Sequence, residues 1–258
     1  MIDDDRCGAA RTRNTVLIIT AVAWGILAFE SHSGLMTHCM TVNFGTLSVA
    51  VFTRHLFTMN SSPTLLTEWF VMLGAMMSPA LIQPVRHLQV HSFTRRRARS
   101  IAVFVIGYIV IWMAVGSSLL GSQLLVEVTA PQSWLPAMAA LVAAVAWQCA
   151  PIKQICLNRC HAHFDVPVFG LAADWGALRF GMIHGLWCAG SCWAVMLACM
   201  LLPRCHLFAM ALATTIIGFE RLERPQPPSW RLRGLGKLFR LVRTRARSLW
   251  ICRGRQWS

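Results

Sequence analysis

The residues best suited to chemistry lie in one uncharged stretch, residues 181–200, with the sequence GMIHGLWCAGSCWAVMLACM. Within it, His184, Cys188 and Cys192 follow one another at steps of four residues. An α-helix turns about 100° per residue, so steps of four keep these side chains on one stripe of the helix. A rise of ~1.5 Å per residue separates His184 from Cys192 by about 12 Å along the axis. The three therefore cannot share one ion on a straight helix, but neighbours at i and i+4 can.

Other soft ligands occur at the same spacing elsewhere. Cys156 and Cys160 stand four residues apart, and a histidine-rich segment follows them. Met72 and Met76 share one face of an earlier apolar stretch. Thiol, thioether and imidazole groups favour Cu(I), whereas hard ions such as Mg²⁺ or Ca²⁺ prefer carboxylates, which are nearly absent from the apolar stretches. The alternative is that Cys and Met fill the core as ordinary apolar side chains and that His184 is an interior group.

The elements that must position these residues are membrane helices. Apolar residues make up 56% of the 258, and several apolar runs reach the ~18 residues that a membrane span needs. Residues 34–53 lack formal charge but are rich in polar residues, so we leave them open as a re-entrant, interfacial or loop segment. The sequence predicts an all-α, polytopic bundle of about six transmembrane helices, at residues 15–29, 65–84, 101–126, 134–155, 179–202 and 205–219.

The charge pattern predicts the orientation of this bundle. The net charge is +14, and with six spans all but two of the 24 Lys and Arg, Arg54 and Arg204, fall on one side. Positive residues mark the cytoplasmic side, so both termini are expected inside. Residues 1–14 then form a cytoplasmic N-terminus, and residues 221–258 form a basic amphipathic tail suited to an anionic inner leaflet. This pattern points to the lipid bilayer as a partner in preference to nucleic acid.

Enzyme chemistry finds no support in the sequence. It contains no P-loop, no nucleophile elbow and no dinucleotide-binding fingerprint, and the apolar stretches hold no acid–base pair. We therefore expect no enzyme. A haem-bearing electron-transfer subunit remains an alternative, but it requires a second deep imidazole opposite His184.

Four segments together resemble a known family. They are EWFVMLGAMMSPALIQP (residues 68–84), WQCAPIKQICLNRC (147–160), GMIHGLWCAGSCW (181–193) and GFERL (218–222). They are similar to a bacterial family of predicted metal-binding integral membrane proteins of unknown function, some of them labelled copper chaperones. The family's pattern falls on Trp69, Met72, Met76, Met77, Pro79, Gln148, Pro151, Lys153, Cys156, Cys160, His184, Gly185, Cys188, Gly190, Cys192, Trp193 and Glu220.

The resemblance implies a bacterial inner-membrane protein whose ligand is copper. One departure is Ser191, where the family usually has a cysteine, which leaves Cys188 and Cys192 as the thiol pair. We expect Cu(I) to be passed across the membrane or to a cuproprotein, with Cys156 and Cys160 as an inner docking point. Glu220 is expected at an exposed membrane interface. The alternative function is a non-catalytic subunit or assembly factor of a membrane complex, without metal.

Overall fold

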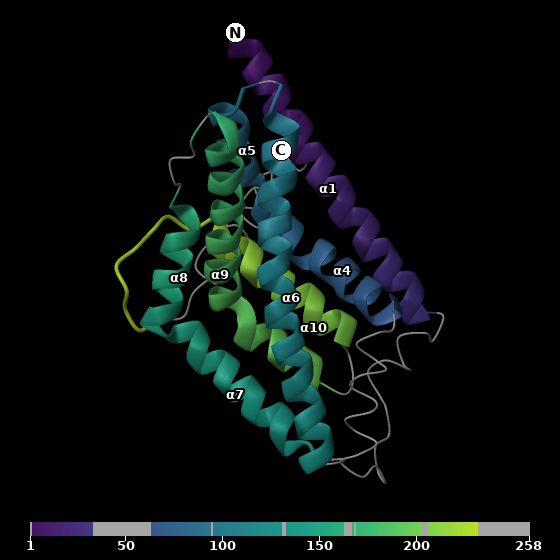
Figure 1. Cartoon of the computed structure of the whole chain (residues 1–258). Coiled ribbons are helices and arrows are strands. Elements are labelled where there is room, and N and C mark those ends of the chain that lie inside the picture. The colour runs from purple at the N-terminus through teal and green to yellow at the C-terminus, as the bar shows by residue number, and fades with distance from the viewer. Residues whose placement is uncertain are drawn as a thin grey trace, which may run out of the picture.

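The computed structural model describes residues 2–32, 63–93, 95–130, 133–162, 167, 169–202 and 206–231. All regular structure in these ranges is helical (Figure 1). Residues 34–53 and the tail beyond Arg231 lie outside the described part. The helices are α1 (Ile2–His32), α4 (Pro63–Met77), the 3₁₀ turn η1 (Ser78–Leu81), α5 (Ile82–His91), α6 (Arg97–Thr129), α7 (Leu135–Cys149), α8 (Pro151–His161), α9 (Gly170–Leu201) and α10 (His206–Arg221).

Helices α6 and α9 run side by side in the same direction and form the centre of the molecule (Figure 1). Their close approach depends on two small residues of α9, Gly181 and Gly185. A Cβ at Gly181 would overlap the backbone of Phe104 on α6, and one at Gly185 would lie 3.3 Å from the carbonyl oxygen of Tyr108. At the shared N-terminal end, two arginines before and within α6 bind a carboxylate of α9. These ion pairs join Arg96 Nη2 to Asp174 Oδ1 at 3.0 Å and Arg99 Nη2 to Asp174 Oδ2 at 2.6 Å.

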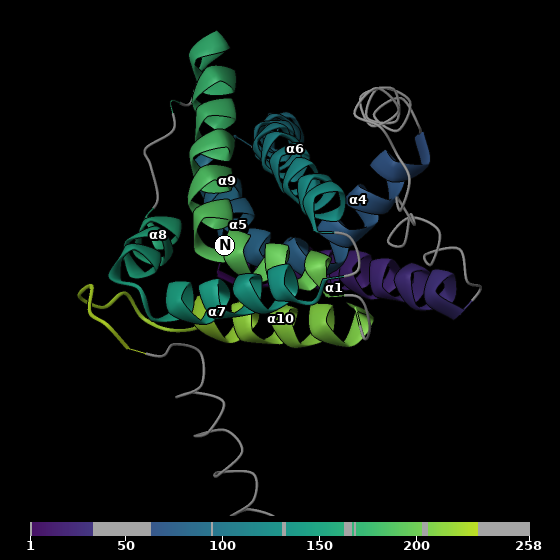
Figure 2. The ribbon, with the colours of Figure 1, turned by 90° about the horizontal axis from the view of Figure 1, so that it is seen from below.

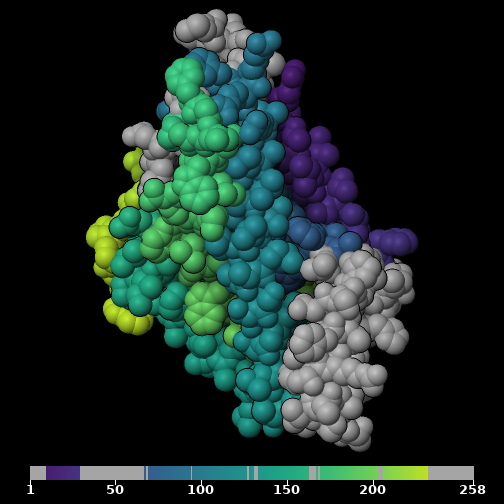
Figure 3. Space-filling model, in the orientation of Figure 1, coloured from purple at the N-terminus to yellow at the C-terminus, as the bar shows by residue number. Residues whose placement is uncertain are grey.

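Three described helices are long and apolar enough to cross a membrane: Ala10–Phe29, Arg97–Val126 and Gly170–Leu201. The bent pair α7 and α8 adds a fourth if it is counted as one span, while α4 and α10, at 15 and 16 residues, are shorter. Helices α6 and α9 form much of the face shown in Figure 3. Several large apolar side chains on α1, α6 and α7 are more than half exposed, among them Ile18, Val22, Val110, Leu125 and Val142. Such outer faces suit lipid contact.

The region predicted as one span at residues 134–155 is two helices. It breaks between Ala150 and Pro151, where α7 and α8 meet at 63°. Proline lacks an amide hydrogen and disfavours helical geometry in the residue before it, and Ala150 is indeed extended, with φ −63° and ψ 137°. The following segment, 156–178, was expected to be a polar connection. Instead it contains the rest of α8 and the first turns of α9.

The bend turns Lys153 of α8 inward, toward the C-terminal turn of α10. The Nζ of Lys153 lies 2.8 Å from Oε1 of Glu220, and these side chains are 0% and 1% exposed. Gln148 donates a hydrogen bond to the same carboxylate oxygen and accepts one from Lys153. The expectation of an exposed Glu220 was therefore wrong, because the break at Ala150 directs Lys153 toward the last turn of α10 and buries the pair.

Helix α10 crosses α9 rather than running alongside it, so its last turn reaches the middle of α9 (Figure 2). The chain that follows α10 then returns to the α7–α8 bend. There the amide of Arg231 donates to the carbonyl of Cys149 at 3.3 Å, and the Asn158 side chain donates to the carbonyl of Gln226 at 2.8 Å. These contacts hold α7, α8 and the end of α10 together around one buried region.

Replacing Gly181 with alanine should separate α6 from α9. The added methyl group meets backbone rather than a movable side chain, so we expect the free energy of unfolding to fall by about 1–3 kcal/mol. The matched control is Gly121→Ala on α6, where no atom lies within 4 Å of the new Cβ and higher helix propensity should hold or raise stability. Thermal unfolding in detergent compares them, and equal melting temperatures for both variants would contradict the close approach.

Removing either member of the Lys153–Glu220 pair should destabilise the fold strongly. A buried charge left without its partner costs roughly 3–5 kcal/mol, so Lys153→Met and Glu220→Leu should each lower the melting temperature by many degrees. Replacing both residues by apolar ones, Lys153→Met with Glu220→Leu, should restore most of that loss. A double-mutant cycle measures the coupling, and simple additivity of the two single effects would show that the residues do not act as a buried pair.

Candidate metal site

The three residues of the predicted stripe lie on the buried side of α9. His184, Cys188 and Cys192 are 3%, 0% and 0% exposed. The Cys192 thiol donates a hydrogen bond to the carbonyl oxygen of Cys188 at 3.2 Å. The hydroxyl of Tyr108, the single tyrosine of the sequence, lies 3.3 Å from the Cys188 sulfur. Cys188 and Cys192 thus form a paired thiol site that is sealed from solvent.

Three other predicted ligands share the contiguous core around this thiol pair. Met72 and Met76 come from α4 and Cys160 comes from α8, and all three are buried. Cys156, one turn earlier on α8, is buried as well but faces a different place. Its sulfur lies 3.1 Å from where a Cβ on Gly190 would stand, in the contact between α8 and α9. Both cysteines of α8, predicted as an inner docking point, are thus buried, because α8 packs against α9.

His184 lies one turn closer to the N-terminus of α9 than Cys188, and its neighbours are aromatic rings. Its ring centroid lies 6.0 Å from that of Tyr108 and 6.1 and 6.2 Å from those of Phe104 and Phe180. It also lines a cavity of about 420 Å³ at the junction of α4, α5, α8, α9 and α10. Soft donors gather on the cavity wall: Met76, Cys160, His161 and His184. The cavity thereby connects His184 to the buried core that contains Met72, Met76, Cys160, Cys188 and Cys192, which we call the sulfur-rich core.

The donor chemistry of this region fits a soft ion better than a hard one. Within the described ranges no three His, Cys, Asp or Glu side chains come together as a metal-binding group. A structural zinc site with four such ligands is therefore not preassembled there. Two adjacent thiols with thioethers nearby instead match the ligands that select Cu(I).

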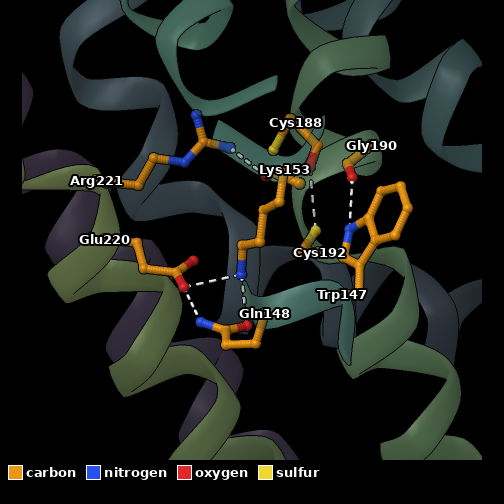
Figure 4. Close-up of polar contacts among 9 residues, drawn as sticks. Trp147, Gln148, Lys153, Cys188, Gly190, Cys192, Glu220 and Arg221 are labelled. Atoms are coloured by element: carbon orange, nitrogen blue, oxygen red, sulfur yellow. Dashed lines mark hydrogen bonds and ion pairs between the residues drawn. The ribbon is translucent and has the colours of Figure 1, made fainter. Parts of the chain in front are cut away.

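Sequence reasoning missed the polar groups that surround the thiols. Arg221, the last residue of α10, donates from Nη2 to the hydroxyl of Ser191 at 3.4 Å, and Ser191 is 1% exposed (Figure 4). On the other side of α9, the indole of Trp147 donates to the Gly190 carbonyl at 3.1 Å. The available signal was the pair of charges, Glu220 and Arg221, directly at the end of an apolar run, since ionisable groups within a membrane protein commonly mark a site.

Comparison with known proteins agrees with this chemistry. Residues 66–241, more than half of the chain, match the family PpoB2, which is described as a copper chaperone. No curated protein and no solved structure matches the chain. The matched region contains α6 to α10, the paired thiols of α9, both cysteines of α8 and the thioethers of α4. The chain therefore belongs to the PpoB2 copper chaperone family.

Proposed function

We propose that this protein is a multi-pass membrane carrier, not an enzyme, that holds Cu(I) on Cys188 and Cys192. The observation that carries the proposal is the pair of fully buried, adjacent thiols on α9 in a family described as copper chaperones. Thiolates are the preferred ligands of Cu(I), and burial protects such a site from water and oxidants.

The surrounding donors support transfer of the ion as well as binding. Cys160 approaches the pair from α8, and Met72 and Met76 approach from α4. A soft ion can move between such ligands by exchange, in which an incoming sulfur binds before an outgoing one leaves. The cavity that contains Met76, Cys160 and His184 on its wall supplies a route by which a cuproprotein or other acceptor takes up the ion.

The proposed setting is the bacterial inner membrane, with six spans and both termini in the cytoplasm. Two features support this topology. The parallel course of α6 and α9 is what the third and fifth of six alternating spans require. The basic residues 95–99 lie at the end that the positive-inside rule assigns to the cytoplasm. In this arrangement α7 and α8 together form one bent span.

A second candidate function is a structural subunit or assembly factor that binds no metal. The absence of a three-ligand group from the described residues favours it, as does the hydrogen bond by which Cys192 is already satisfied. In that case the thiols act only as small apolar side chains. Metal content separates the two candidates.

Replacing either of the α9 thiols Cys188 and Cys192 should weaken copper binding. We expect Cys188→Ser and Cys192→Ser each to lower the Cu(I) affinity of the anaerobically purified protein at least about tenfold, because each removes one ligand of a pair. Competition with a chromogenic Cu(I) chelator measures the affinity. Cys160→Ser should slow transfer to an acceptor chelator more than it lowers affinity.

The matched control is Cys199→Ser, which replaces a buried thiol on the same helix, seven residues beyond Cys192 and about 10 Å along the axis. It should leave copper affinity unchanged. The carrier proposal is excluded if the unmutated protein holds no Cu(I), or if all three serine variants of α9 bind it equally well.

The topology gives a prediction of its own. Reporter fusions after residue 14 and at residue 258 should both show a cytoplasmic location, and a fusion between α6 and α7, near Ser133, should show an external one. The physical reason is the concentration of Lys and Arg on alternate connections. A reporter at residue 258 that is active only outside the cytoplasm would rule out the six-span arrangement.

A further inference from the structure

Arg221 extends from the end of α10 into the buried region of α9. Its Nε is sealed from solvent, and its Nη2 donates to Ser191, the residue that directly precedes Cys192 (Figure 4). Arg221 also lines the same cavity as Cys160 of α8. The guanidinium therefore lies where α10 meets the cysteine-bearing parts of α8 and α9.

The positive charge of Arg221 has no carboxylate partner in the described part of the chain. The ion pairs there use Arg96, Arg99 and Lys153 as cations. Glu220 precedes Arg221 directly, but its carboxylate faces Lys153, whose charge it balances. Arg221 is partly buried and its Nε is sealed from solvent. Because a cation withdrawn from water without a counter-charge is costly, the position of Arg221 calls for an anion supplied by something else.

The groups near Arg221 that can become anionic are sulfur and phenol groups. Cys160 lines the same cavity as Arg221. Ser191, which Arg221 contacts, directly precedes Cys192 and donates to the carbonyl of Cys188, whose sulfur lies 3.3 Å from the hydroxyl of Tyr108. A thiol gives up its proton when it binds a metal, so metal binding is the step that creates negative charge at this place. Two thiolates with one monovalent ion leave a single net negative charge, which one guanidinium balances. Two thiolates with a divalent ion are already neutral and leave the guanidinium unbalanced.

We propose that Arg221 is the counter-charge of a two-thiolate site at Cys188 and Cys192 and makes that site selective for monovalent soft ions, Cu(I) and Ag(I), over Zn²⁺. This inference rests on the proposed copper-carrier function and adds a specificity-determining residue to it. Arg221 does not ligate the ion. It acts through the thiolates, in a buried setting where a nearby charge has a large effect.

The test compares Arg221→Met, which removes the charge, with Arg221→Lys, which keeps it. The matched control is Arg159→Gln, which removes an exposed arginine of α8 whose guanidinium carbon lies 5.7 Å from the ring centre of Trp187. Cu(I), Ag(I) and Zn²⁺ affinities are measured by chelator competition on each full-length variant under anaerobic conditions. Arg221→Met should weaken Cu(I) and Ag(I) at least about tenfold and leave Zn²⁺ equal or tighter. Arg221→Lys should recover most of the Cu(I) affinity, and Arg159→Gln should match the unmutated protein.

Thermal unfolding of the metal-free variants separates this role from a structural one. Removing this partly buried cation, which has no carboxylate partner in the described residues, should hold or raise the melting temperature of the metal-free protein, while the extra stabilisation by added Cu(I) should shrink. The inference is overturned if the unmutated protein binds Cu(I) but Arg221→Met keeps the same affinity and selectivity. It is also overturned if Arg221→Met melts at a lower temperature without metal and Arg221→Lys restores no affinity. If the unmutated protein binds neither Cu(I) nor Ag(I), the carrier function fails, and this inference fails with it.

Discussion

The close approach of α6 to α9 is the constraint on which the rest of the structure depends. Gly181 and Gly185 bring the backbone of α9 close to the backbone of α6 at Phe104 and Tyr108. This contact sets the rotation of α9 about its own axis. That rotation in turn decides that Cys188 faces the hydroxyl of Tyr108 and not the lipid-facing surface. A helix rotated by a quarter turn would present the same cysteines to a different neighbour.

Around this pair of helices lie one buried ion pair and one arginine that has no carboxylate partner in the described residues. Lys153 and Glu220 neutralise each other between α8 and α10, at a place where either alone would be costly. Arg221, the next residue, is directed to the opposite side, toward Ser191 and the thiols. The last turn of α10 thus performs two tasks. One residue anchors the helix to α8, and the next brings a positive charge to the sulfur-rich core.

The chemistry of a soft-ion carrier is consistent with this arrangement. Binding needs thiols kept out of water, and release needs further donors within reach of the ion. Cys188 and Cys192 meet the first need on α9, and Cys160 with Met76 meets the second, from α8 and α4. Because these donors come from three helices, a change in the packing of α8 or α4 alters the ligands available to the ion. Binding and release can therefore be coupled to movement of helices, which a site on one rigid helix would not allow.

The sequence by itself determined the properties that depend on local periodicity and composition. Apolar runs without charges determined helices of membrane length, and steps of four residues determined that His184, Cys188 and Cys192 share one stripe of α9. The ligand types, thiol and thioether with few carboxylates, indicated a soft metal, and the family match agrees with copper.

Only the tertiary structure decided which faces of the helices contact one another. The break at Pro151 separates α7 from α8 and turns Lys153 toward Glu220, although charge counting had assigned Lys153 to a cytoplasmic connection. Packing of α8 on α9 also divides its two cysteines, so that Cys160 joins the core of Cys188 while Cys156 lies against Gly190. Arg221 gained its place because α10 crosses α9 instead of running beside it. Periodicity describes one helix at a time, whereas the direction of a bend or a crossing results from contacts between residues far apart in the chain.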